Sequence, residues 1–105
     1  MSDLNKGEIG QPLVVNFGED ISSATSSIID LQPELGVKKE FTGTIPATNF
    51  VVDGVILALA NEYVLYTTLT KEDLDYVGRV RMRAKLTFSS TDERKSNYVK
   101  FRVLP

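Results

Sequence analysis

Apolar and basic residues alternate strictly near the end of the chain, over residues 79–86. Four basic residues occupy every second position: Arg79, Arg81, Arg83 and Lys85. Five apolar residues lie between or just after them: Val80, Met82, Ala84, Leu86 and Phe88. Successive side chains of a β-strand point to opposite faces of the sheet. The pattern therefore predicts a strand with an apolar inner face and a cationic outer face.

The last segment, 98–104, repeats the same arrangement. Val99, Phe101 and Val103 alternate with Lys100 and Arg102. We therefore expect a second strand whose outer face is also basic. We call these six basic residues of the two strands the basic ladder: Arg79, Arg81, Arg83, Lys85, Lys100 and Arg102.

Further strands are predicted from apolar and β-branched stretches bounded by turn residues. They cover residues 12–17, 25–31, 37–45, 51–59 and 63–69. Within 51–59, Asp53-Gly54 is a turn or bulge signal. The sequence Pro33-Glu34-Leu35-Gly36 is predicted to be a turn, and the polar segment 89–97 a loop. A helix over residues 54–63 is the competing interpretation, because Ala58, Leu59 and Ala60 favour helix.

One helical turn is predicted over residues 71–76, because Thr70 can cap it and Asp73 follows three residues later. About seven short strands with polar turns predict an all-β fold, an antiparallel β-sandwich. We assign residues 1–10 to an N-terminal arm and residues 11–105 to a single β-sandwich domain.

The composition limits the chemistry that this chain can perform. It contains no cysteine, histidine or tryptophan. Ser-His-Asp and Cys-His catalytic arrangements and His/Cys zinc sites are therefore excluded. The first residues have no apolar core of a secretory signal, and the longest apolar run, 55–60, is far too short to span a membrane. We expect a non-enzymatic protein without a cofactor, made in the cytoplasm.

Charge is divided unevenly along the chain, although its formal net charge is only −2. Residues 79–105 contain eight basic and two acidic residues, whereas residues 1–78 contain four basic and twelve acidic residues. Such a division favours contacts between oppositely charged surfaces, including surfaces of two copies. The alternative is that the outer faces of a sandwich are charged for solubility.

Several motifs, in order, resemble those of a known group of proteins. Residues 20–25 read Asp-Ile-Ser-Ser-Ala-Thr, residues 33–36 form the Pro-Glu-Leu-Gly turn, and residues 69–78 read Leu-Thr-Lys-Glu-Asp-Leu-Asp-Tyr-Val-Gly. The chain closes on Val-Lys-Phe-Arg-Val at 99–103. This series, over roughly residues 8–104, is similar to small immunoglobulin-like virion proteins of tailed bacteriophages, including the N-terminal domain of the baseplate upper protein family. The turn at 33–36 is one residue longer than in that family, and Arg79 and Val80 replace its usual aromatic residue.

The resemblance implies an immunoglobulin-like sandwich that serves as a structural component of a phage particle, in the tail or baseplate, the neck or the head. Its partners would be other virion proteins and copies of itself in a ring, with no membrane and no small-molecule substrate. The protein would be located in the virion, after synthesis in the host bacterial cytoplasm. An adhesion or host-recognition module, acting through loops such as 46–49 or 89–97, is the alternative.

Three functions can be considered for the basic ladder. It can be an assembly surface for an acidic neighbour, a contact for nucleic acid phosphates, or a solvated face that cross-strand residues such as Glu40 or Glu62 neutralise. The overall acidic balance and the lack of interleaved aromatic residues disfavour nucleic acid. We predict an assembly interface at the ladder.

Other candidate sites are weaker. Glu72, Asp73 and Asp75 can be considered as Ca²⁺ ligands, but their spacing does not match an EF-hand, and a helix start also favours carboxylates. Glu19 and Asp20 are better explained by a turn than by acid–base catalysis.

The four tyrosines are Tyr63, Tyr66, Tyr76 and Tyr98. Tyrosine is enriched at interfaces, so each is a candidate anchor. We expect at least two of them to be ordinary strand residues that lie half in the core.

Overall fold

One large sheet and two strand pairs make up the fold of residues 3–105, the part of the chain that the computed structural model describes. The large sheet has the order β1 (Leu4–Asn5), β10 (Val99–Leu104), β8 (Gly78–Ser89), β3 (Ser26–Pro33) and β4 (Lys39–Thr42), and β9 (Asp92–Lys95) also pairs with β8. The two pairs are β2 (Pro12–Asn16) with β7 (Tyr63–Thr67), and β5 (Phe50–Val52) with β6 (Val55–Ala58).

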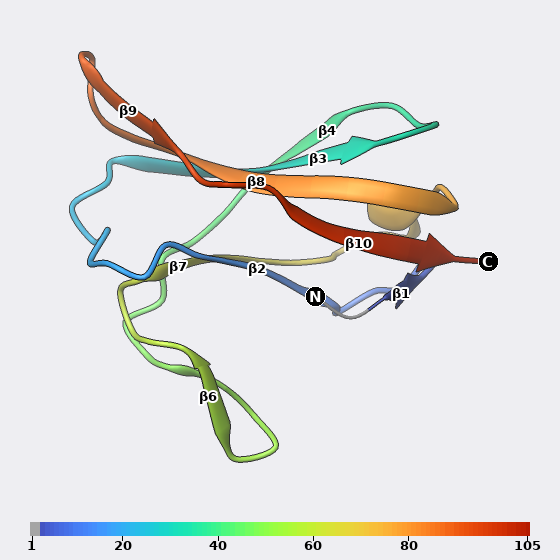
Figure 1. Ribbon diagram of the computed structural model, residues 1–105, viewed down its shortest axis with the longest axis horizontal. Coiled ribbons are helices and arrows are strands. Elements are labelled where there is room, and N and C mark those ends of the chain that lie inside the picture. Colours follow the sequence, from blue (N-terminus) through green and yellow to red (C-terminus); the bar gives the residue numbers. More distant parts are fainter. Residues whose placement is uncertain (1–2) are drawn as a thin grey trace.

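The strand order is that of an immunoglobulin-like sandwich. In such domains strands G, F and C form one sheet, C′ can extend it, and B pairs with E in the other sheet. Here β10, β8, β3 and β4 follow the order G-F-C-C′, and β2 pairs with β7 as B does with E. The predicted all-β antiparallel β-sandwich is therefore confirmed. Figure 1 shows the large sheet above the β2–β7 layer.

The core lies between these two layers and follows the predicted alternation. In β8, Val80, Met82, Ala84 and Leu86 are buried, while the basic residues between them face outwards. The other layer contributes Leu13, Val15 and Val64. The curled sheet also brings Phe101 and Val103 of β10 into this core.

Residues 51–59, predicted as one strand, form a hairpin instead. Asp53 and Gly54 have positive φ angles of 51° and 78° and lie between β5 and β6. An Asp-Gly pair with two positive φ values is typical of the tight turn that reverses a strand onto itself. The alternative helix over residues 54–63 is also wrong, since β6 pairs with β5 through Val55 and Ile56.

One loop prediction and one strand prediction also need correction. The polar segment 89–97 contains β9, which pairs with the far end of β8 from Lys85 to Ser89. Its residues are mostly exposed, so no apolar alternation marked it as a strand. The strand predicted at 37–45 is shorter, spanning Lys39–Thr42.

The N-terminal segment is docked on the large sheet. Leu4 is buried, and β1 runs parallel to β10 with Leu4 opposite Val103. The backbone N–H of Lys6 donates to the carbonyl oxygen of Leu104 at 2.7 Å. Burial of Leu4 and backbone pairing with β10 thus hold a segment that its polar composition marks as an irregular arm.

The predicted helical turn is present as a 3₁₀ turn, η1 (Lys71–Leu74). Across residues 3–105, no helix has the length and apolar character that crossing a bilayer requires.

Candidate functional site

The basic ladder lies on the outer face of the large sheet. Its members Arg79, Arg81, Arg83 and Lys85 come from β8, and Lys100 and Arg102 come from the neighbouring strand β10. The prediction that all six share the solvent side of the sandwich is therefore confirmed. The ladder nevertheless divides into two halves with different surroundings.

A buried carboxylate neutralises one half. The side chain of Asp30 in β3 is fully buried, although it is on the outer face, because longer side chains cover it. Its Oδ2 lies 3.7 Å from Arg83 Nε and 3.9 Å from Lys85 Nζ. Lys38 Nζ approaches the same oxygen at 3.7 Å, and Lys85 also pairs with Glu40 at 3.1 Å.

The sequence prediction of neutralising residues was partly right. Glu40 does lie beside the ladder, whereas Glu62 lies just before β7 and donates its backbone N–H to the carbonyl oxygen of Leu59. Asp30 was missed. Its sequence signal was a lone acidic residue between the core residues Ile29 and Leu31.

The other half of the ladder has few carboxylates. Lys100 lies directly opposite Arg81 in the register of β10 and β8, and Arg102 lies opposite Arg79. Like charges directly opposite each other destabilise a sheet. Within residues 3–105, the only carboxylate that forms an ion pair with these four is Asp3, 2.9 Å from Arg102 Nη2. The hydrogen bond from Arg102 holds the pKa of Asp3 below its ordinary value.

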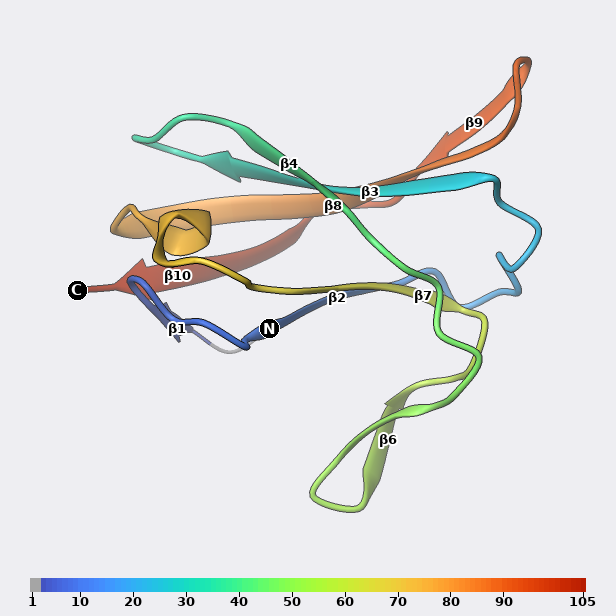
Figure 2. The ribbon, with the colours of Figure 1, turned by 180° about the vertical axis from the view of Figure 1, so that it is seen from behind.

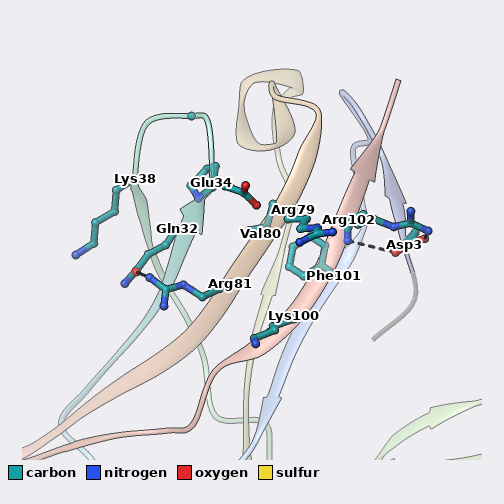
Figure 3. Close-up of a pocket in the computed structure, with 12 residues that line it drawn as sticks. Asp3, Gln32, Glu34, Lys38, Arg79, Val80, Arg81, Lys100, Phe101 and Arg102 are labelled. Atoms are coloured by element: carbon teal, nitrogen blue, oxygen red, sulfur yellow. Dashed lines mark hydrogen bonds and ion pairs between the residues drawn. The ribbon is translucent and has the colours of Figure 1, made fainter.

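These four cations line an open hollow of about 810 Å³ at the surface of β3, β8 and β10. We call it the cationic groove. Lys38 adds a fifth cation to the groove, and Asp3 and Glu34 are the acidic residues that line the groove. Figure 3 shows the side chains of Lys38 and Arg81 on one side and those of Lys100 and Arg102 on the other. The groove therefore has an excess of three positive charges.

Neighbouring side chains hold Arg81 in place. Its Nη2 donates to Gln32 Oε1 at 3.0 Å, and its guanidinium lies 4.6 Å from the ring centroid of Tyr98. Arg83 approaches the same ring at 4.8 Å. A guanidinium within about 6 Å of an aromatic ring is attracted by the ring electrons. Arg81 is thus ordered before any ligand binds, which lowers the entropic cost of binding.

The acidic residues near η1 do not converge on one point. Asp73 Oδ2 accepts hydrogen bonds from the backbone N–H of Leu69 at 2.8 Å and from the Tyr66 hydroxyl at 2.8 Å. Asp75 instead pairs with Lys39 at 2.8 Å. Within the described part of the chain, no three Asp or Glu side chains gather to hold a metal ion. The hydrogen bonds of Asp73 stabilise the connection between β7 and η1, and this structural role explains its position.

Burial of the Asp73 carboxyl disfavours its ionisation and raises its pKa. The hydrogen bonds from Leu69, Tyr66 and Thr70 outweigh this effect and hold the pKa of Asp73 below the ordinary value. Burial and the hydrogen bond to Asp73 together raise the pKa of Tyr66 to about 12. Tyr66 also stacks on Phe41 of β4, with ring centroids 4.4 Å apart. Its ring therefore connects β4, β7 and η1.

Tyr63 and Asp20 also have structural positions. Tyr63 is buried and its hydroxyl donates to the carbonyl oxygen of Thr48 at 2.9 Å. Tyr66, in the same strand, packs partly buried against the core, so two of the four tyrosines are strand residues of the core region. Asp20 Oδ1 accepts the backbone N–H of Ser22 at 2.9 Å, and this bond lowers the pKa of Asp20. Asp20 therefore stabilises a turn.

Comparison of this chain with protein-family models, with curated proteins and with solved structures found no match. Its function must therefore be argued from the surfaces described above.

Proposed function

We propose that this chain is a non-enzymatic structural subunit of a tailed-phage particle, in the tail or baseplate, the neck or the head, and that it binds a neighbouring virion protein at the cationic groove. Two things support the proposal: the series of phage-like motifs in the sequence, and a rigid immunoglobulin-like sandwich with a charged face. It would be made in the host bacterial cytoplasm and located in the virion.

The observation that carries the proposal is the pairing of like charges across β8 and β10. Arg81 opposite Lys100 and Arg79 opposite Arg102 are unfavourable for the isolated domain. The other half of the ladder has Asp30 and Glu40 to neutralise it. A bound acidic segment would offset the repulsion in the groove and would also accelerate encounter.

The partner surface should be acidic. One source is another virion protein, and another is a second copy, because residues 1–78 contain twelve acidic against four basic residues. Nucleic acid is disfavoured by the overall net charge of −2.

The test reverses two groove charges, Arg81→Glu with Lys100→Glu, and measures how much protein enters purified particles by mass spectrometry. The charge-matched control is Lys71→Glu with Lys95→Glu, because both side chains are exposed and neither lines the groove. We expect the groove variant to fold but to be incorporated poorly, and the control to be incorporated normally. Normal incorporation of the groove variant would refute the proposal.

Arg83 is unsuitable for this test. A glutamate at residue 83 would lie beside the buried Asp30, so a loss of assembly could reflect loss of stability. Reversal of Arg81 and Lys100 avoids that carboxylate.

The adhesion alternative is tested with the same proteins. Binding of the purified chain to host cells, unaffected by the two groove substitutions, would favour a host-recognition role over assembly.

A further inference from the structure

The hairpin of β5 and β6 exposes an unusual amount of apolar surface. Five aliphatic residues on the two sides of its Asp53-Gly54 turn are each 42–57% exposed: Val51, Val52, Val55, Ile56 and Leu57. Val51 lies opposite Ile56, and Val52 lies opposite Val55. Since successive strand residues point to opposite faces, both faces of the hairpin are apolar. We call Phe50–Ala58 the apolar hairpin.

The apolar hairpin extends away from the sandwich. Both views show it leaving the two layers and ending in a tip (Figure 1, Figure 2). Across residues 3–105, β5 and β6 pair only with each other, so both outer edges are open for backbone pairing. Contiguous exposed apolar surface of this kind marks an interaction site.

The base of the hairpin is held firmly. The Phe50 ring lies 6.0 Å from the ring of the buried Tyr63. Asn49 Oδ1 accepts the backbone N–H of Ala60 at 2.8 Å. The apolar side chains are therefore presented on a fixed support.

A second apolar patch lies at the other end of the sandwich, around the turn between β3 and β4. Leu35 is 89% exposed, Val37 79% and Val77 47%. A hollow of about 380 Å³ lies there, bordered by Leu35, Val77 and Arg79 and also by Glu34 and Gly78. We call Leu35, Val37 and Val77 the apolar pole. Figure 1 shows the hairpin leaving the sandwich near the start of β7, away from this turn.

We propose that the apolar hairpin of one copy docks on the apolar pole of the next copy. The chain carries both halves of the contact, and each half has a charge that can pair with the other, although Glu34 also borders the hollow beside Arg79. Asp53, at the tip, is the only ionisable residue between residues 50 and 59. Arg79, which borders the hollow, forms no side-chain ion pair with any of residues 3–105. Asp53 of one copy would therefore meet Arg79 of the other, while Val52 and Val55 cover Leu35 and Val77.

This inference deepens the proposed assembly role and rests on it. The two patches differ and lie at different places on the molecule, so the contact is heterologous. A heterologous contact continues from copy to copy and produces a ring when the rotation closes. The partner is thus a second copy of this chain.

The absence of cysteine from the chain permits a direct test. One preparation carries Val52→Cys in the apolar hairpin, and a second, tagged preparation carries Val77→Cys at the apolar pole. Both positions are substantially exposed, so the substitutions should not disturb folding. Equal amounts are mixed under mild oxidation and separated on a non-reducing gel. We expect the mixed disulfide between the two preparations to be the main product.

Controls separate this contact from random collision. A tagged Ser90→Cys protein, with its cysteine in the exposed β8–β9 turn, should cross-link to Val52→Cys far less. Adding Arg79→Glu to the Val77→Cys protein should lower the yield, whereas Lys95→Glu should not. Formation mainly of Val52→Cys homodimers would overturn the inference in favour of a hairpin–hairpin dimer. A yield no higher than with Ser90→Cys would overturn it as well.

A separate readout distinguishes failure of this inference from failure of the assembly role. If the cross-link is absent, yet wild-type protein enters particles and Val52→Asp protein does not, the hairpin docks on a different virion protein. The self-contact is then wrong and the assembly role stands. If wild-type protein itself is absent from particles, the assembly role is wrong.

Discussion

Arg81 lies directly opposite Lys100 where β8 and β10 pair on the outer face of the sandwich. Tyr98 and Gln32 fix Arg81 on one side of the groove, but no carboxylate of residues 3–105 forms an ion pair with either cation. Two like charges at one register position reduce the stability of the isolated domain. They also create the local potential that an acidic partner requires, so stability and binding should respond oppositely to a change here.

We therefore expect Lys100→Glu to stabilise the domain while it weakens assembly. Replacing the like pair by an opposite pair should raise the free energy of unfolding by about 0.2–1 kcal/mol. Urea denaturation measures the first effect, and incorporation into particles measures the second. Lys71→Glu serves as the control for charge alone. A variant that is both less stable and normally incorporated would contradict this account.

Asp30 is expected to be an important charge for folding. Asp30→Asn keeps the shape but removes the charge that Lys38, Arg83 and Lys85 approach within 4 Å, so the domain should lose about 1–3 kcal/mol. Glu40→Gln is the matched control, because Glu40 is 47% exposed and should change stability by less than about 0.5 kcal/mol. Equal effects of the two substitutions in chemical denaturation would show that burial of Asp30 is unimportant.

The lowered pKa of Asp73 predicts a specific acid response. Both the folded and the unfolded chain carry this carboxylate ionised at neutral pH, where its hydrogen bonds stabilise the fold. As the pH falls through the ordinary aspartate value of about 4, the unfolded chain binds the proton first, and stability is lost progressively down to the lower folded pKa.

Asp73→Asn should therefore cost about 1.5–3 kcal/mol at pH 7 and flatten the dependence of unfolding free energy on pH below about 4. Urea titrations at several pH values measure both effects. Asp75→Asn, at a half-exposed carboxylate, is the control. An unchanged pH dependence in Asp73→Asn would contradict the role of these hydrogen bonds.

Gly43 lies where the chain leaves β4 and passes close to β7. A methyl group there would lie 2.5 Å from Val64 Cγ1, so Gly43→Ala should destabilise the domain by about 1–3 kcal/mol through overpacking. Val64→Ala removes that methyl group. The double variant should thus lose less than the sum of the two single losses in thermal unfolding, and strict additivity would contradict the steric explanation.

Some features follow from the sequence pattern, because they depend only on the order of neighbouring residues along a strand. The alternation in β8 and β10 predicted the strands, the buried residues such as Met82 and Phe101, and the outward direction of the basic ladder. The apolar segment 51–59 forms two strands because Asp53 and Gly54 both adopt positive φ angles and reverse the chain. The hydrophobicity of the segment does not show this reversal. β9 was missed because pairing with β8, and not burial, makes it a strand.

The sequence by itself determined that this protein is all-β, that one outer face is basic, and that histidine and cysteine chemistry is excluded, since periodicity and composition are local properties. Only the tertiary structure decided which of those basic residues are neutralised, because that depends on the register that places Asp30 against Arg83 and leaves Lys100 against Arg81. It also decided that the apolar run around Val55 leaves the core and projects into solvent, since burial depends on the neighbours that the fold brings together.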